Sequence, residues 1–252
     1  TFDKIVDIDK TAEVFIRRMT NKCTYLLNKD VIAKQSILYS DFCVLNELSN
    51  IKVNNHKLSS NEKKLIIDKL FKIKKIVKVN DLKQLLLDYQ VYSEIDSITG
   101  LADNDKFTSN MSSFIDMQNL FGTIDENNIE LIEKIIEWIT IFEDKKILKR
   151  KIKKEYNLDD KIINKLVKKR YSGWSRLSKE LLVDLKSYDD KKSIMEKLQT
   201  TKENFIQIIS NDKYGFNKQI ERIINDKNSK VSYETVSELQ TSPANKRAIW
   251  QS

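Results

Sequence analysis

Apolar residues recur every three or four positions along most of this chain, the spacing that places them on one side of an α-helix. The clearest case is the stretch 128–142, whose broad apolar face consists of Ile129, Leu131, Ile132, Ile135, Ile136, Ile139 and Phe142. Shorter stripes of the same spacing occupy 65–71, 82–86, 162–167, 177–185, 194–198 and 205–209. The pattern predicts a succession of amphipathic helices.

Polar residues ahead of these stripes can begin the helices. Ser59 and Glu62 have the spacing of a capping box, in which each side chain accepts a hydrogen bond from the other residue's backbone N–H. Asn80 can cap the next helix, and Asn157 or Asp159 can cap the helix over 162–167.

Two acidic pairs and a proline also suit helix starts. The acidic pairs at 159–160 and 189–190 would complement the dipole of a helix N-terminus. Lysines follow both pairs directly, which argues against a two-metal nuclease centre. Pro243 suits the first turn of a last helix over 244–250.

The composition agrees with a helical fold. The chain has only four glycines and one proline in 252 residues, too few turn residues for a β-sandwich or barrel. The segment 73–80 is the one stretch that reads as short and extended. We therefore predict an all-α fold, an irregular multi-helix bundle of about ten to twelve helices.

Several kinds of site are excluded by what the chain lacks. Its glycines lie far apart, so no glycine-rich phosphate-binding loop can form. With only two cysteines and a single histidine, His56, the chain has too few ligands for the common zinc fingers and ribbons. A nucleophilic enzyme would have to use His56, which has the surroundings of a polar turn residue. No stretch of about 18 apolar residues exists that would span a membrane.

The positive charge is concentrated in one segment. The chain has a net charge of +8, whereas residues 145–179 alone carry 14 basic and three acidic residues. Seven of these basic residues fall within 145–154 and repel one another unless an anion neutralises them. A polyphosphate partner would do so and release counterions. A solvated helix face is the alternative reading.

A glycine-containing break follows the basic run, at 171–176. In one reading Gly173 ends a helix and Trp174 packs in the core or at a hinge. In the other, the break exposes Arg176 and the N–H groups of the next helix N-terminus to phosphate or ribose. The two readings are compatible, since a packed tryptophan can hold an arginine in place.

At this block the sequence resembles a known family. The stretch 168–178 (KKRYSGWSRLS) is similar to the recognition-lobe signature of type II CRISPR RNA-guided DNA endonucleases. Other blocks resemble the family in the same order: 12–21 (AEVFIRRMTN), 36–39 (SILY), 44–48 (VLNEL), 142–144 (FED), 204–207 (NFIQ) and 242–247 (SPANKR).

The resemblance implies a piece of a larger enzyme. It places residues 1–10 in a segment that leads in from the preceding part of the parent. Residues 11–252 would form the third helical domain of the recognition lobe, ending just before the second RNase-H-like nuclease segment. The fragment itself would be non-catalytic and without cofactor, while the parent's nuclease sites would use Mg²⁺. A bacterial cytoplasmic location follows from the same resemblance.

The resemblance also implies a function and a set of contacts. Such a domain lies on the PAM-distal guide RNA–target DNA heteroduplex, reads its backbone, and helps license docking of the nuclease domains. Family positions near that backbone match Asn21, Tyr39, Arg176, Asn204 and Gln207. Trp174 is expected to pack beside Arg176, and the basic run is expected to contribute Lys169 and Arg170.

Two other functions compete with this hypothesis. The first is a protein-interaction module whose basic face binds an acidic partner, such as an anti-CRISPR inhibitor that mimics nucleic acid. The second is a free-standing enzyme that relies on His56 and scattered carboxylates.

Overall fold

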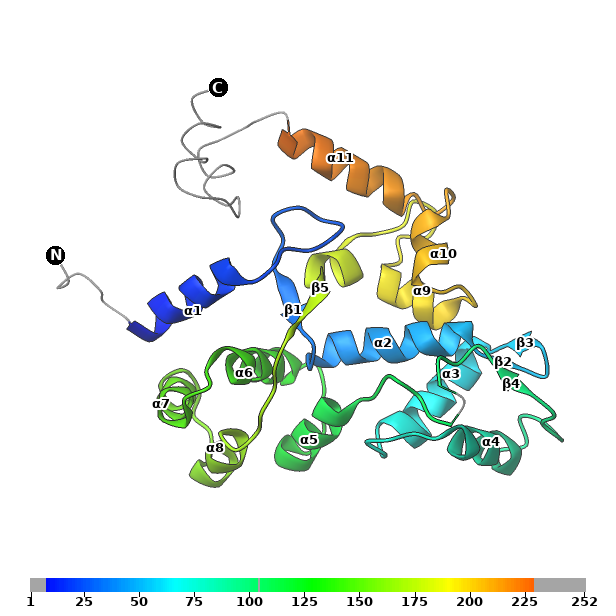
Figure 1. Ribbon diagram of the computed structural model, residues 1–252, viewed down its shortest axis with the longest axis horizontal. Helices are drawn as coiled ribbons and strands as arrows, with labels where there is room; N and C mark the ends of the chain where they lie inside the picture. Colours follow the sequence, from blue (N-terminus) through cyan, green and yellow to red (C-terminus); the bar gives the residue numbers. More distant parts are fainter. Residues whose placement is uncertain (1–7, 104, 229–252) are drawn as a thin grey trace.

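The computed structural model describes residues 8–103 and 105–228 (Figure 1). The α-helices are α1 (Ile8–Met19), α2 (Ile37–Asn50), α3 (Ser60–Ile66), α4 (Val79–Asp88), α5 (Ser112–Phe121), α6 (Ile129–Ile141), α7 (Lys145–Glu155), α8 (Asp160–Leu166), α9 (Ile194–Thr200), α10 (Phe205–Ser210) and α11 (Phe216–Asn228). Two π-helical segments are η2 (Ile67–Phe71) and η3 (Glu180–Asp184). The strands are β1 (Val31–Ala33), β2 (Lys52–Val53), β3 (His56–Lys57), β4 (Ile98–Thr99) and β5 (Trp174–Ser178).

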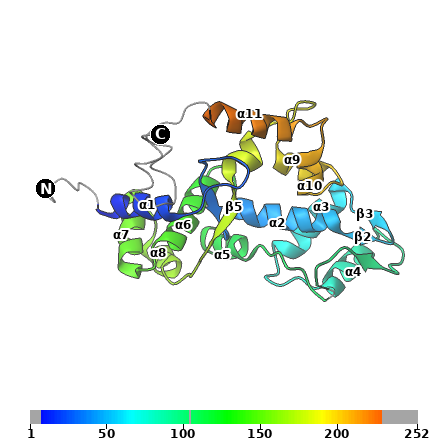
Figure 2. The same ribbon diagram turned by 45° about the horizontal axis from the view of Figure 1, so that its top comes forward.

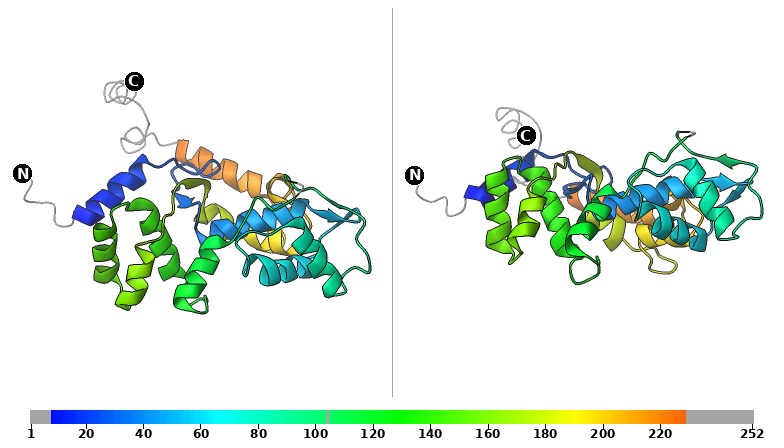
Figure 3. Two further views of the ribbon diagram at one scale, coloured as in Figure 1. Left: turned by 60° about the horizontal axis from the view of Figure 1, so that its bottom comes forward. Right: turned by 90° about the horizontal axis from the view of Figure 1, so that it is seen from below.

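Helix α2 runs through the middle of the molecule and carries much of the core. Its buried side chains include Phe42, Val44, Leu45 and Leu48. Helices α5 and α9 pack against it. Figures 2 and 3 show an elongated molecule, with α7 and α8 towards one end and the β2–β4 sheet towards the other.

The start of α2 is fixed by a residue from α6. Ser36 is the N-cap, and its side chain accepts a hydrogen bond from the backbone N–H of Tyr39. The Glu133 carboxylate accepts from Ser36 Oγ at 3.1 Å and from the Leu38 backbone N–H at 2.8 Å. Burial raises the pKa of Glu133, while these hydrogen bonds favour its ionised form. This contact joins α6 to the N-terminal end of α2, which follows β1 in the chain.

Two small antiparallel sheets complete the architecture. In the first, β1 pairs with β5, with Val31 opposite Ser178 and a register irregularity before Ala33 pairs with Trp174. In the second, β2 lies between β3 and β4. The turn from β2 to β3 has positive φ at Asn54 (48°) and Asn55 (66°), the geometry of a tight hairpin turn.

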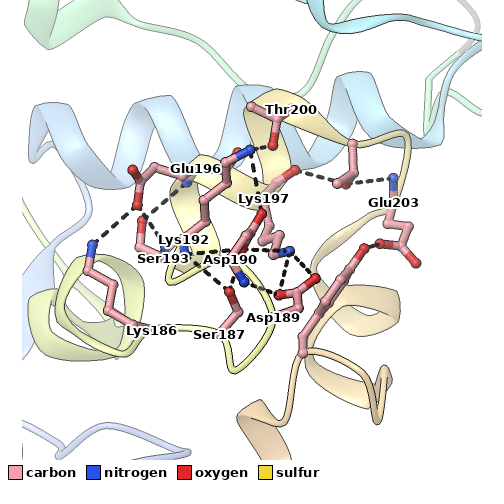
Figure 4. A network of polar contacts seen from close by, with 12 residues as sticks. Lys186, Ser187, Asp189, Asp190, Lys192, Ser193, Glu196, Lys197, Thr200 and Glu203 are labelled. Carbon is pink, nitrogen blue, oxygen red and sulfur yellow. Dashed lines mark hydrogen bonds and ion pairs between the residues drawn. The ribbon is translucent and has the colours of Figure 1, made fainter.

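A polar network holds the turn before α9 (Figure 4). The buried Lys197 Nζ lies 3.0 Å from carboxylate oxygens of both Asp189 and Asp190. The same ammonium group lies 3.8 Å from the centre of the Tyr214 ring. Hydrogen bonds to Ser187 and Lys197 hold the pKa of Asp190 far below its usual range, although desolvation opposes them. The network fixes α9 against the segment that leads into α11.

The prediction of a mainly helical fold is confirmed, and so are several helix boundaries. The helix expected over 128–142 is α6, and its predicted apolar face is largely buried. Ser59 and Glu62 form the expected capping box at α3. Asp159 caps α8, one of the two alternatives for that helix.

Other local predictions were wrong. The stripe at 177–185 is the end of β5 followed by η3, because Trp174–Ser178 pairs with a strand far away in sequence. The segment 73–80 is not a short strand; of its two readings the connection holds, with a single bridge from Lys78 to Lys106 before α4 begins. Lys78 rather than Asn80 precedes α4. The helix predicted after Pro243 lies outside the described residues.

The acidic pair at 189–190 was also misassigned. It lies in a turn, and α9 begins later, at Ile194. Ser193 is the cap of α9 and forms a capping box with Glu196. The two aspartates instead bind Lys197, a residue three positions beyond the start of α9.

Candidate nucleic-acid interface

Arg176 lies at the middle of β5 and points away from the core. Its strand neighbours Ser175 and Leu177 are buried, whereas Arg176 is exposed, as the alternation of a strand requires. The backbone carbonyl of Arg176 accepts a hydrogen bond from the Thr24 N–H at 3.0 Å. This bond brings the segment after α1, which contains Asn21, next to β5. A strand occupies the place of the predicted helix N-terminus, so N–H groups of a helix end do not accompany Arg176.

The Arg176 guanidinium is available for a ligand. Within the described part of the chain, no hydrogen bond or ion pair engages its side chain. Tyr39 on α2 is close enough for the charge of Arg176 to act on its hydroxyl. Burial, reinforced by Cys43, nevertheless raises the pKa of Tyr39 to about 12. The phenol therefore stays protonated at neutral pH, and its hydroxyl is hydrogen-bonded to the Cys43 side chain.

A cluster of aromatic rings lies beneath this region. Phe42 stacks with Tyr39 at a centroid distance of 5.8 Å and meets the Phe205 ring edge-on at 5.1 Å. The Tyr25 ring also packs edge-on against Phe205, with the two ring centroids 5.4 Å apart. The rings connect the segment after α1, helix α2 and helix α10, and such contacts add to the energy of simple burial.

Asn204 and Gln207 are positioned by a capping box at α10. The Asn204 side chain accepts from the Gln207 N–H at 2.9 Å, and Gln207 Oε1 accepts from the Asn204 N–H at 3.0 Å. Asn204 Nδ2 also donates to Asn50 Oδ1, and Lys57 Nζ donates to Gln207 Oε1. Both side-chain oxygens are thus occupied. Gln207 is exposed, and its amide nitrogen has no partner among the described residues.

Five of the eight predicted residues lie on segments that the aromatic cluster and the Thr24–Arg176 bond connect. Tyr39 lies near the start of α2, whereas Asn204 and Gln207 bond Asn50 at its end and Lys57 on β3. We call this region the Arg176 surface, and it consists of Asn21, Tyr39, Arg176, Asn204 and Gln207. Asn21 is exposed in the segment between α1 and β1. The amide, hydroxyl and guanidinium groups of this surface suit the oxygens of a sugar–phosphate backbone.

Trp174 has a partner that the sequence did not reveal. The Arg17 guanidinium lies over the Trp174 ring, 4.5 Å from its centre. Arg17 is held there by a hydrogen bond from Nη1 to the Val31 carbonyl (3.0 Å) and by an ion pair with Glu137 (3.2 Å). The nearest sequence signal is the matched block 12–21, which contains Arg17 but does not indicate this contact.

Lys169 makes a different contact, with Asp116 on α5, and Arg170 follows it in the chain. Lys169 Nζ is paired with Asp116 at 2.9 Å, and the same carboxylate binds Lys75 at 2.7 Å. The Tyr171 hydroxyl donates to Asp116 at 3.3 Å. Burial opposes ionisation of Asp116, but the two lysines hold its pKa below the usual value. Lys169 thus anchors the segment before β5, while Arg170 is exposed.

Part of the basic run is neutralised within the protein. Lys151 is buried on α7 and paired with Glu13 (3.3 Å) and Glu155 (3.6 Å). Lys149 donates to Asn164, and Lys153 pairs with Asp160. The expectation that the cluster requires an external anion was therefore too strong. Exposed lysines without an ion pair in the described ranges remain on and after α7 and α8: Lys145, Lys146, Lys161, Lys165 and Lys168.

Two further kinds of site are absent from the described ranges. Residues 8–103 and 105–228 contain no group of three or more histidine, cysteine or carboxylate side chains placed to hold a metal ion. None of the helices there has the length and apolar character needed to cross a bilayer.

Comparison with known proteins defines the class. The family described as "REC lobe of CRISPR-associated endonuclease Cas9" matches residues 1–223. The chain belongs to this family. It is 31% identical to the CRISPR-associated endonuclease Cas9 of Streptococcus mutans serotype c and 34% identical to that of Listeria innocua serovar 6a, over 100% and 98% of its length. It spans about a fifth of the length of these relatives (20% and 19%).

Proposed function

We propose that this chain binds the backbone of a guide RNA–target DNA heteroduplex in its PAM-distal part and helps license docking of the parent's nuclease domains. The observation that carries the proposal is Arg176, an exposed guanidinium that is held on a paired strand and has no partner among the described residues. An arginine held on a paired strand near a protonated phenol suits phosphate and ribose oxygens, and the exposed amides of the same surface would extend the contact along the backbone.

Each group has a distinct role in this proposal. Arg176 binds a phosphate, with a charge that does not depend on pH. The amides of Asn21 and Gln207 bond phosphate or a ribose 2′-hydroxyl, the group that distinguishes RNA from DNA. Asn204 acts through Gln207, because its own side chain caps α10. Tyr39 forms part of the floor of the surface.

The exposed lysines of α7 and α8 have a long-range role. They raise the local concentration of a polyanion without defining its position, and their effect is screened within about 8 Å at physiological salt. A protein of this kind reads helix geometry and leaves sequence recognition to base pairing. The domain has no catalytic step of its own in this proposal. Cleavage belongs to the Mg²⁺-dependent nuclease domains of a cytoplasmic parent.

The test compares duplexes of one sequence. Fluorescence anisotropy of the 252-residue chain would be measured with a labelled RNA–DNA hybrid of about 20 base pairs and with the corresponding B-form DNA, at several salt concentrations. We expect tighter binding to the hybrid and a steep loss of affinity with salt for both. Equal affinity for the two duplexes would overturn shape recognition and leave only charge-driven binding.

A further inference from the structure

A cavity of about 630 Å³ lies on the other side of α2 from the Arg176 surface. It is enclosed by α2, by α3 and η2, by the start of α5 and by the turn that leads into α6. Its apolar walls include Ile37, Leu45, Ile67, Met111 and Phe114. The volume is that of a small-molecule site, and polar residues from α2, α3, η2, the turn before α6 and the end of α9 complete its lining.

One polar group in this cavity stands out. Asp41 on α2 lines the cavity, and its carboxylate makes no hydrogen bond or ion pair with any residue that the structure describes. Burial raises the pKa of Asp41 to about 6, because the ionised carboxylate loses solvation, and the nearby Lys72 charge, which is opposed by Asp68, offsets only part of that loss. At neutral pH the cavity therefore contains a negative charge that the described residues do not pair.

Of the three lysines that line the cavity, Lys63 and Lys72 are already engaged within the described part of the chain and Lys64 is not. From α3, Lys63 donates to Ser49 Oγ and to the carbonyls of Leu198 and Thr201, at 2.6–2.9 Å. After η2, Lys72 pairs with Asp68 at 2.7 Å. The remaining charged lining residues are Lys64 from α3 and Asp125 and Glu126 before α6, while α5 and α9 contribute none.

The aromatic ring in the apolar wall already faces a cation of the protein itself. The Lys72 ammonium lies 5.6 Å from the centre of the Phe114 ring, so this ring already faces a positive charge. Cations bind aromatic faces at such distances, and more strongly where water is excluded. The cavity thus combines an aromatic face, an aliphatic wall and the Asp41 carboxylate.

We propose that this cavity is a binding site for a small primary amine with an apolar body. The ammonium group pairs with Asp41 and the body packs between Leu45, Met111 and Phe114. The carboxylate gives the site its preference for a cation, and the apolar wall excludes compact, strongly hydrated ions. This site is separate from the proposed nucleic-acid surface, and the proposal does not depend on heteroduplex binding.

The probes are three molecules of one shape that differ in charge: 2-phenylethylamine, 2-phenylethanol and 3-phenylpropionate. Binding to the 252-residue chain would be followed by calorimetry and by methyl NMR shifts of the isoleucine, leucine and methionine residues in the wall. We expect the amine to bind at least about tenfold more tightly than the alcohol near neutral pH, and the carboxylate not to bind. The preference should shrink as the pH falls below about 6, where Asp41 becomes protonated.

Asp41→Asn removes the charge and keeps the shape. It should abolish the preference for the amine over the alcohol. Asp88→Asn, which removes a charge from α4 away from the cavity, should leave the preference unchanged. The proposal is wrong if the alcohol binds as tightly as the amine, if Asp41→Asn keeps the preference, or if folded wild-type protein binds no amine. If Asp41→Asn does not fold, the pH dependence of the wild-type preference decides.

Discussion

Arg17 and Trp174, which belong to elements far apart in the sequence, form one cation–π pair with the guanidinium 4.5 Å from the ring centre. The pair attaches α1 to the first residue of β5. Because Arg17 also bonds the Val31 carbonyl, it fixes both strands of the small β1–β5 sheet at once. The placement of Arg176, two residues further along β5, depends on this attachment.

We expect Arg17 and Trp174 to be coupled energetically. In a double-mutant cycle with Arg17→Met and Trp174→Leu, urea unfolding should give a coupling energy of ~0.5–2 kcal/mol. Arg18→Met is the matched control, since Arg18 is the exposed neighbour on the same helix. Coupling of the same size between Arg18 and Trp174 would contradict a specific pair.

Arg176→Gln should weaken hybrid binding without loss of stability. An exposed side chain with no protein partner contributes within about 0.5 kcal/mol to folding, so the urea midpoint should remain unchanged. The slope of log affinity against log salt should fall by about one, as expected for one lost phosphate contact. Lys83→Gln removes an exposed charge from α4 and should have no such effect.

Asn204 can be tested as a positioning residue. Asn204→Ala removes the α10 cap and should cost ~1 kcal/mol of stability, with a parallel loss of hybrid affinity. Asn204→Ser retains a capping oxygen and should recover both quantities to a large extent. If Asn204→Ser restores stability but not affinity, Asn204 contacts the nucleic acid itself and the role assigned here is wrong.

Alanine substitutions at two glycines can distinguish backbone strain from a steric clash. Gly215 has φ of 69°, and a Cβ atom there would meet the Tyr188 ring. Gly122 has φ of 77°, but a Cβ atom at this residue would have nothing within 4 Å. Gly122, with ψ of −129°, lies outside the left-handed helical region, so Gly122→Ala should cost ~1–3 kcal/mol from conformation alone, and the clash at Gly215 should make Gly215→Ala cost more. Similar urea midpoints for the two variants would show that the ring moves freely.

The pH dependence of the free energy of unfolding should show the titration of the Asp41 carboxyl group. Its folded-state pKa of about 6 lies above the unfolded value of ~3.9, so the folded state retains a proton that the unfolded state has lost between these values. The contribution of Asp41 to stability therefore falls as pH rises from about 4 to 6 and stays low above that range.

Asp41→Asn should abolish this fall. Thermal unfolding near neutral pH should occur at a higher temperature in the variant than in the wild type, whereas below pH ~4 the two should converge. A variant that is destabilised to the same degree at every pH would instead indicate that Asp41 has a hydrogen-bond partner in the folded protein.

The sequence predicted helices well where one face is buried locally. The apolar spacing in α6 and the caps Ser59 and Asp159 are properties of contiguous residues, and the structure confirms them. Strand β5 could not be predicted in this way. It is five residues long and its partner β1 lies far upstream, so neither periodicity nor turn residues indicate the pairing.

The candidate site was predictable as a set of positions but not as a set of contacts. Resemblance to the family pointed to Asn21, Tyr39 and Arg176, but not to the Thr24–Arg176 backbone bond or the Tyr39–Phe42 ring contact that hold their segments. The same resemblance could not separate Lys169, which is committed to Asp116, from a freely available lysine. Ion pairing between distant segments leaves no local pattern in a single sequence.

The β1–β5 ladder joins segments about 150 residues apart in the chain, and closure of so large a loop is entropically costly. Most of α2 to α8 can pack through shorter-range contacts before this ladder forms. We therefore expect the ladder to form late in folding, and with it the surface that carries Arg176. A nascent or partly folded chain presents its lysines to any polyanion, but it acquires a defined binding geometry only when the ladder closes.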